Sequence, residues 1–295
     1  MNGGKLNQLS RRLLRRLGEA TLLVALGGLA GAALVRFSPG YGVDIRELDP
    51  RLSEDSLASM RDENSLPQGV LSFYVNHLAG VLKGDLGSSD FFGQPIRELI
   101  ADRMPATVGL LAAGLAGAWT LGLGAALLGT WKSSKAFDLV TTFASSAFLC
   151  LPSALLALLF FLWGDSGALA LVFVLFPQVF RYTRNLLEEA GRSPHALAAR
   201  ARGVSEARIL FAHVVLPVAG PLLALLGVSV NLAFGASIPI EVICGRPGIG
   251  QLAWEAALSR DLPLLVNVTM AVTLLTVGAN AVSDCARTAL EARAS

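Results

Sequence analysis

Long apolar runs separated by polar segments make up most of this chain. Five runs are long enough to cross the hydrocarbon core of a bilayer as helices: residues 17–37, 106–130, 137–163, 214–240 and 262–282. A sixth and shorter run, residues 168–180, can also span if its helix continues to about Leu187. Arg181 and Arg184 then reach the interface with their long side chains. The pattern predicts an all-α polytopic membrane protein with six transmembrane helices.

The composition agrees with a bilayer environment and excludes several kinds of partner. Hydrophobic residues make up 53% of the 295 residues and charged residues only 16%, whereas a soluble domain has about 25% charged residues. The net charge of +2 is too small to indicate nucleic acid as a partner. Cys150, Cys244 and Cys285 lie far apart in the sequence, so their spacing indicates neither a metal site nor a disulfide framework.

Lysine and arginine residues are distributed unevenly between the polar segments, which indicates the orientation in the membrane. With six spans, four basic segments fall on one side: the N-terminus, the turn at Lys132 and Lys135, residues 181–208 and the C-terminal tail. The opposite side carries residues 38–105, with six basic and eleven acidic residues. We therefore expect both termini in the cytoplasm. Three regions follow: a cytoplasmic N-terminus with the first span at 1–37, a small extracytoplasmic insertion at 38–105 and a main transmembrane domain at 106–290.

No pattern in the sequence indicates a catalytic centre. The motifs of serine hydrolases, zinc proteases and P-loop ATPases are absent from the sequence. The apolar runs also lack the pair of aspartates that an intramembrane protease needs. Glu19 and Asp284 lie about one turn from a cytoplasmic boundary, where they can reach water. We therefore expect no enzyme activity, no metal and no proton-relay carboxylate in the middle of a span.

A polar island, residues 188–217, interrupts the apolar runs, and its first half predicts a helix. Pro194 suits the first turn of a helix, and Ser193 before it suits the N-cap, where its hydroxyl would accept a backbone N–H. Alanine and leucine favour a helix over residues 195–202. Gly203 suits the left-handed residue that ends such a helix.

A second short helix can begin in the same island at Ser205, which suits an N-cap position. We expect two helices at an angle in a cytoplasmic loop, residues 188–213. If small side chains face outward, a partner can approach closely, and Arg200 and Arg202 can form ion pairs with it. An amphipathic helix resting on anionic lipid headgroups fits the same residues equally well. The residues alone leave both interpretations open.

The island resembles the EAA loop in the membrane subunits of ATP-binding-cassette importers. In that family a Glu- and Ala-rich helix, a glycine and a later Leu-Pro pair form the coupling helix, which docks in a groove of the ATPase subunit. The matching positions here are Glu189, Ala199, Ala201, Gly203, Leu216 and Pro217. The resemblance assigns nine residues to ATPase coupling: Glu189, Ala199, Arg200, Ala201, Arg202, Gly203, Ser205, Leu216 and Pro217. It also implies that the glycine sets the angle between the coupling helix and the fifth span.

Three other segments resemble the peptide and nickel branch of these importers, the dipeptide and oligopeptide permeases in particular. Residues 83–89 resemble its GDLG-S turn, residues 103–107 resemble the R-L-P-A-T that opens its second span, and residues 241–263 resemble its re-entrant segment before the last span. This last segment implies an extracytoplasmic mouth formed by Glu241, Arg246, Pro247, Gly248, Gly250, Asp261 and Pro263. The resemblance covers nearly the whole chain, in order.

The resemblance implies a permease subunit with the transmembrane domain of a type I importer, in the bacterial cytoplasmic (inner) membrane. Its partners would be a second permease subunit, two ATP-binding subunits that bind ATP and Mg, and an extracytoplasmic substrate-binding protein. This chain itself would hold no cofactor. The cargo would be peptides or a related small solute. Two other interpretations stay open: a membrane scaffold or sensor that uses the island as an interfacial helix, and a secondary transporter.

Overall fold

The computed structural model describes residues 18, 22, 25–30, 33, 74, 77–81, 83–132, 135–164 and 167–294. The named helices are α4 (Ile96–Lys132), α5 (Lys135–Cys150), α6 (Ser153–Leu162), α7 (Gly167–Gly191), α8 (Pro194–Ala201), α9 (Glu206–Arg208), the π-helix η2 (Ile209–Val215), α10 (Leu216–Ile243), α11 (Ile249–Leu258) and α12 (Leu262–Ala294). Within the described residues no β-strand forms, only an isolated bridge between Ser88 and Pro95. The all-α class is confirmed for these residues. Much of the predicted first span, and residues 38–73 of the predicted insertion, lie outside them.

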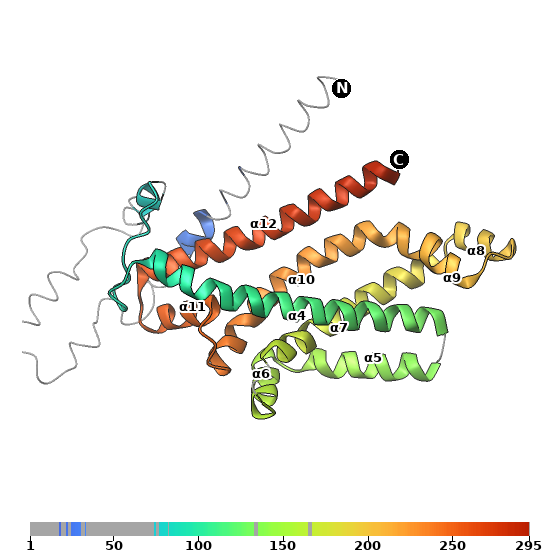
Figure 1. Cartoon of the computed structure of the whole chain (residues 1–295), viewed down its shortest axis with the longest axis horizontal. Coiled ribbons are helices and arrows are strands. Elements are labelled where there is room, and N and C mark those ends of the chain that lie inside the picture. Colours follow the sequence, from blue (N-terminus) through green and yellow to red (C-terminus); the bar gives the residue numbers. More distant parts are fainter. Residues whose placement is uncertain are drawn as a thin grey trace, which may run out of the picture. The chain divides into compact units, whose positions relative to one another are not determined.

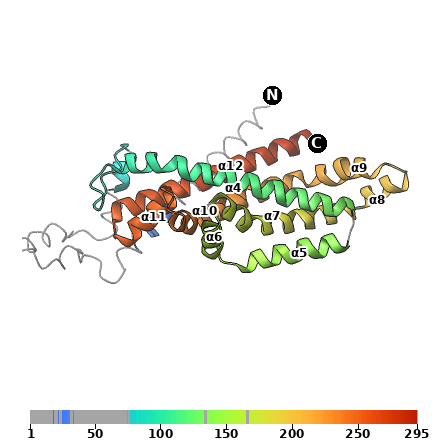
Figure 2. The same ribbon diagram turned by 60° about the horizontal axis from the view of Figure 1, so that its bottom comes forward.

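The described residues form two compact units, and α4, α11 and α12 each contribute to both. One unit combines the described residues before Arg103 with Leu252–Leu274, and the other combines Arg103–Gln251 with the last part of α12. In the second unit α4, α7 and α10 run lengthwise, with α5 alongside and with α8 and α9 at one end (Figures 1 and 2). The polar island therefore lies entirely in the second unit.

Three helices are long and apolar enough to cross a membrane: Ile96–Trp131, Glu206–Ile243 and Leu262–Thr288. They contain the predicted second, fifth and sixth spans. About 20 residues suffice to cross the hydrocarbon core, so helices of 36, 38 and 27 residues leave room for polar ends outside it. A multi-pass helical membrane protein is therefore confirmed, but six spans are not found among the described residues.

The predicted third span, residues 137–163, is not one helix. α5 and α6 are bent by 102° at the break between Cys150 and Ser153. Pro152 lies at this break with an extended backbone, at a ψ angle of 144°, because a proline removes a helical hydrogen bond and restricts the residue before it. Phe148 of α5 and Phe160 of α6 both stack on Phe173 of α7, with ring centroids 4.7 and 5.3 Å apart. These contacts stabilise the bend on both sides.

α7 corresponds to the shorter predicted fourth run, and other helices of the second unit cover much of it. It packs against α5, α6, α8, η2 and α10, and ten of its residues are buried. Neighbouring helices cover parts of its surface that lipid would contact in an outer span. α7 therefore needs fewer apolar side chains. The positive charge of Arg184 is balanced by Asp138 at 2.8 Å and by Glu188 at 2.5 Å. Tertiary packing therefore explains why its hydropathy signal is weak.

The predicted fifth span begins at residue 214, but the structure has one continuous helical stretch from Glu206 to Ile243. It passes from α9 through the seven residues of η2 into α10. Pro217 has no N–H to donate to the carbonyl of His213 four residues earlier, and its ring would clash with that carbonyl in a regular α-helix. The wider turns of a π-helix relieve such a clash. Pro217 thus accounts for the π-helix η2, which immediately precedes α10.

Candidate functional site

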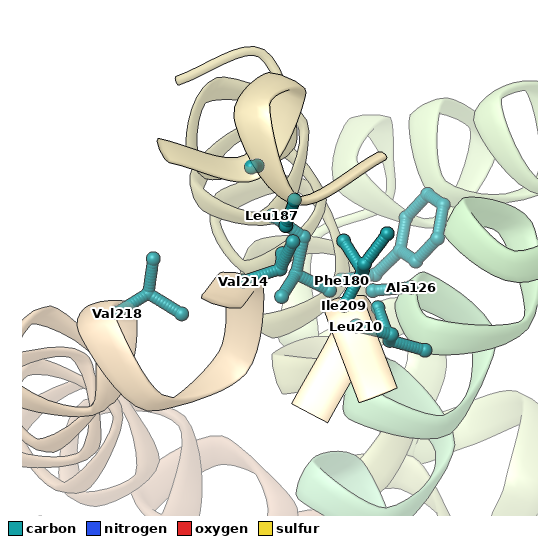
Figure 3. Packing of buried hydrophobic residues seen from close by; sticks show 9 residues of the cluster. Ala126, Phe180, Leu187, Ile209, Leu210, Val214 and Val218 are labelled. Carbon is teal, nitrogen blue, oxygen red and sulfur yellow. The ribbon is translucent and has the colours of Figure 1, made fainter. Parts of the chain in front are cut away.

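Two small side chains hold α8, the predicted coupling helix, on the rest of the second unit. Ala196 and Ala199 are both 0% exposed, and α8 contacts η2 and α7. Both alanines belong to a buried cluster at the start of α10 that also contains Ala126, Phe180, Leu187, Ile209, Leu210, Val214 and Val218. Figure 3 shows Ala126, Phe180, Ile209 and Leu210 grouped together, and Val218 at the edge of the cluster. The prediction that small residues of this helix face outward is therefore wrong for these two alanines. Their small size allows α8 to approach η2 closely.

The opposite face of α8 is exposed and could receive a partner. It presents Pro194, His195, Leu197, Ala198, Ala201 and Arg202. Leu197 is the large apolar residue of this face, and 54% of it is exposed. Glu189, at the end of α7, is exposed as well.

Ser193 and Arg200 serve the loop itself. Ser193 occupies the N-cap of α8 as predicted, but its hydroxyl makes no cap hydrogen bond and donates instead to the carbonyl of Ala190 at 2.5 Å. Arg200 pairs with Glu206 at 3.2 Å and donates to the carbonyl of Gly191, also at 3.2 Å. The guanidinium of Arg200 therefore connects the end of α7 with the start of α9, whereas Arg202 remains on the outward face.

Gly203 ends α8 in the predicted left-handed conformation, with a φ of 75°. The N–H of Gly203 donates to the carbonyl of Arg200 at 2.9 Å, and the N–H of Val204 donates to the carbonyl of Ala199 at 3.2 Å. These two bonds form the Schellman arrangement, which closes a helix and turns the chain away from it. The glycine therefore sets the angle between α8 and the helical stretch that leads into α10.

A polar contact also joins α8 to η2. Nε2 of His195 lies 3.0 Å from the carbonyl oxygen of His213, the same carbonyl that Pro217 deprives of its usual α-helical donor. Because a carbonyl oxygen only accepts, the imidazole must donate its N–H. This contact is not among those predicted from the sequence. A histidine one position into the coupling helix and a proline four residues after His213 are the features that could have indicated it.

The second predicted site, the mouth, includes a buried carboxylate, that of Glu241. Glu241 is 0% exposed. Its Oε1 accepts from the hydroxyl of Thr107 at 2.7 Å, and its Oε2 accepts from the backbone N–H groups of Gly250 at 2.7 Å and Gln251 at 3.1 Å. The side chain of Arg103 lies 3.4 Å from that of Gln251. Two of the segments recognised separately in the sequence, residues 103–107 and 241–252, therefore bind each other.

The turn between α10 and α11 holds the other mouth residues of the second unit. The N–H of Arg246 donates to the carbonyl of Glu241 at 2.9 Å, and the N–H of Gly248 donates to the carbonyl of Arg246 at 2.8 Å. Pro247 is exposed at the tip of the turn, whereas Gly248 is buried. The turn therefore returns the chain directly onto the carboxylate of Glu241.

The last two predicted mouth residues, Asp261 and Pro263, belong to the first unit. Asp261 is 2% exposed and caps α12 by accepting from the N–H of Leu264 at 2.9 Å. It also accepts from the N–H of Phe91 at 3.1 Å and from the hydroxyl of Ser89. Pro263 stands in the first turn of α12, where a missing N–H needs no partner. The turn at residues 83–89 and the predicted mouth segment around Asp261 are therefore also joined by hydrogen bonds.

Replacing Asp261 with asparagine is expected to destabilise the first unit by about 1–3 kcal/mol, because the new NH₂ group must face one of the three donors that the carboxylate accepts. Thermal unfolding of the purified chain in detergent measures this loss. Asp102→Asn is the matched control, since Asp102 belongs to the same unit and is exposed. Equal unfolding temperatures for the two variants would show that Asp261 is no anchor.

The long apolar helices, with the polar island between two of them, define a class: a multi-pass helical membrane protein. The sequence comparison identifies its family. The chain belongs to the family described as binding-protein-dependent transport system inner membrane component, which matches residues 118–295. It is therefore a multi-pass inner-membrane component of such a system and not an enzyme.

The chain is also similar to individual permeases over most of its length. It is 25% identical to the probable peptide ABC transporter permease protein y4tP of Sinorhizobium fredii, with 95% of this chain and 98% of that protein covered. It is 27% identical to the oligopeptide transport system permease protein OppB of Salmonella typhimurium, with 89% and 92% covered. It is 24% identical to the oligopeptide transport system permease protein AppB of Bacillus subtilis, with 85% and 88% covered.

Proposed function

We propose that this chain is the permease subunit of an ATP-binding-cassette importer and that, with a second permease subunit, it forms the path for ATP-driven uptake of peptides. The family and the names of the similar permeases support this proposal. The main observation behind the proposal is the packing of α8. One face of this helix is exposed, and its other face is packed in the buried cluster at the start of α10. A scaffold or a lipid-bound sensor would need no such mechanical connection to a span.

The contacts of α8 suggest how work done by the ATPase reaches the path. Two ATP-binding subunits, which hold ATP and Mg, would grip the exposed face of α8. When they close, η2 would move with α8, because Ala196 and Ala199 are buried in the same cluster as three η2 residues and His195 donates to the carbonyl of His213. η2 continues unbroken into α10, so the displacement reaches the fifth span. The path would then alternate between inward-facing and outward-facing states.

The same proposal fixes the sides of the membrane. The lysine and arginine residues of the island and of both ends of the chain favour the cytoplasm for these segments. The mouth segments would then face the extracytoplasmic side, where a substrate-binding protein delivers the cargo. Both termini would be cytoplasmic, and α8 would stand on the side where ATP is available.

Replacing Leu197 with glutamate is expected to reduce the amount of ATPase subunit that co-purifies with the chain by about tenfold or more. The substitution puts a charge at the centre of the proposed docking face, where desolvation makes such a change costly. Thr288→Glu is the matched control, because it adds the same charge at an exposed position of α12. The measurement is the subunit ratio after purification from membranes in mild detergent.

Wild-type behaviour separates this proposal from its rivals. If no ATPase subunit accompanies the wild-type chain, the scaffold or sensor is the better interpretation. If uptake of a labelled alanine tripeptide survives ATP depletion and stops when the ion gradient is removed, the protein is a secondary transporter. The proposal requires the reverse: co-purification of an ATPase, and uptake that ends with ATP.

A further inference from the structure

The carboxylate of Glu241 accepts the hydrogen bonds of backbone N–H groups at the start of α11, directly or through one hydroxyl. The N–H groups of Gly250 and Gln251, in the first turn of α11, donate directly to Glu241. The N–H of Ile249 donates to the hydroxyl of Thr107 at 2.7 Å, and this hydroxyl donates in turn to Glu241. Three successive backbone donors therefore end on the same anion, directly or through one hydroxyl. These are the donors that a helix start leaves without intrahelical partners.

The anion and the helix start suit each other electrostatically. The N-terminus of a helix carries a partial positive charge, and Glu241 faces it from the neighbouring turn of α10. A buried carboxylate is tolerated only if its charge is matched by donors, and here both oxygens have them. Thr107 belongs to α4, Glu241 to α10 and Ile249–Gln251 to α11. All of them lie in the second unit, so the network joins three helices at one point.

Two glycines without side chains allow the start of α11 to lie close to Glu241. A Cβ added at Gly248 would lie 2.3 Å from the carboxyl carbon of Glu241, and a Cβ added at Gly250 would lie 2.8 Å from the Cα of Ile238. A side chain at Gly250 would meet the backbone of α10 and push α11 away from it, and a side chain at Gly248 would displace the carboxylate of Glu241. The two glycines thus let the re-entrant helix start in direct contact with the carboxylate.

We propose that Glu241 and Thr107 are positioning residues that clasp α11 to α4 and α10, so that the three helices move as one body during the transport cycle. This inference rests on the proposed function for its role in transport. The contact of Glu241 and Thr107 with the start of α11, here called the clasp, keeps α11 in a fixed position against α4 and α10 while the spans move. Without it, ATP hydrolysis would continue, but the mouth would no longer follow the spans.

The test uses two substitutions of one residue. Thr107→Val keeps the shape of the side chain and removes the hydroxyl, so the N–H of Ile249 loses its acceptor and Glu241 loses a donor. Thr107→Ser keeps the hydroxyl and is the matched control. Cys244 reports on the clasp, because it is 6% exposed and lies one turn after Glu241. Serine replaces Cys150 and Cys285, which are exposed, so that a maleimide can react only at Cys244.

We expect the maleimide to label Cys244 about ten times faster in the purified Thr107→Val chain than in the wild type, because buried donors and acceptors have lost their partners. The Thr107→Ser chain should be labelled at the wild-type rate. In the complete transporter, Thr107→Val should keep ATP hydrolysis within about twofold of wild type while uptake of a labelled alanine tripeptide falls about tenfold. Thr107→Ser should restore uptake.

Each outcome decides between the clasp and the alternatives. Equal labelling and equal uptake for the valine and serine variants would overturn the inference. If Thr107→Val does not accumulate in the membrane, Glu241→Gln takes its place, and wild-type labelling of that variant would overturn the inference as well. The labelling is measured on this chain alone, so it decides on the clasp even if no ATPase subunit co-purifies and the proposed function fails.

Discussion

Replacing Gly203 with valine is expected to leave the protein in the membrane and to reduce ATP-driven uptake at least about tenfold. The residue has a φ of 75°, in the left-handed region that costs about 1–2 kcal/mol for an ordinary residue and more for a β-branched one. A Cβ at this position would have open space around it, with no atom within 4 Å. The substitution therefore acts through the backbone alone. It should open the turn after α8 and change the angle at which α8 meets η2.

Gly203→Asn is the matched control for this prediction. Asparagine tolerates the left-handed conformation better than other residues with a side chain, and the open space can accept its amide. The asparagine variant should keep most of the uptake. Membrane content, ATP hydrolysis and peptide uptake are measured together for the three proteins. Normal uptake in the valine variant would exclude the assignment of α8 as the coupling helix.

Replacing Gly250 with alanine is expected to lower the unfolding temperature clearly and to abolish most of the uptake. The new methyl group would lie 2.8 Å from the Cα and 3.1 Å from the N of Ile238, and 2.9 Å from Oε2 of Glu241. Two of these atoms belong to the backbone of α10, so no side-chain rotation can relieve the overlap. Overpacking of this kind costs about 1–3 kcal/mol. The methyl group would also separate Glu241 from the first turn of α11.

Gly235→Ala, in α10, is the matched control, because its Cβ would meet no atom within 4 Å. Alanine stabilises a helix interior relative to glycine by about 0.5–1 kcal/mol. The two substitutions are chemically identical, yet they should change the unfolding temperature of the purified chain in opposite directions. A Gly250→Ala chain as stable as the wild type would mean that α11 does not pack against α10 as described.

The four segments that resemble importer motifs illustrate how far the sequence could lead. Each was recognised from its residues, and their order along the chain identified the family. Nothing local in residues 103–107 indicates that Thr107 meets Glu241, 134 positions later. Nothing local indicates that Ser89 meets Asp261, 172 positions later. Glu241 was therefore predicted as one of several residues at a mouth, although the structure makes it the centre of a buried network.

Proline shows the same limit within single helices. Pro105, Pro152 and Pro177 all occur in or beside apolar runs, and membrane helices tolerate proline when neighbours satisfy the freed carbonyl. Pro105 and Pro177 lie inside continuous helices, whereas Pro152 marks a bend of 102°. The sequence predicted a single third span over residues 137–163, because a proline alone does not reveal whether a helix continues through it or bends there. Packing of the flanking aromatic rings on Phe173 distinguishes the bend.

The sequence by itself determined the membrane class, the positions of the second, fifth and sixth spans and the two ends of α8. These features depend on local chemistry: lipid demands a continuous apolar surface, and proline and glycine restrict or permit particular backbone angles. Only the tertiary structure decided which face of α8 is buried, where the third span bends and which segments bind each other. Those features depend on contacts between residues that are far apart in the chain, and local sequence does not specify such contacts.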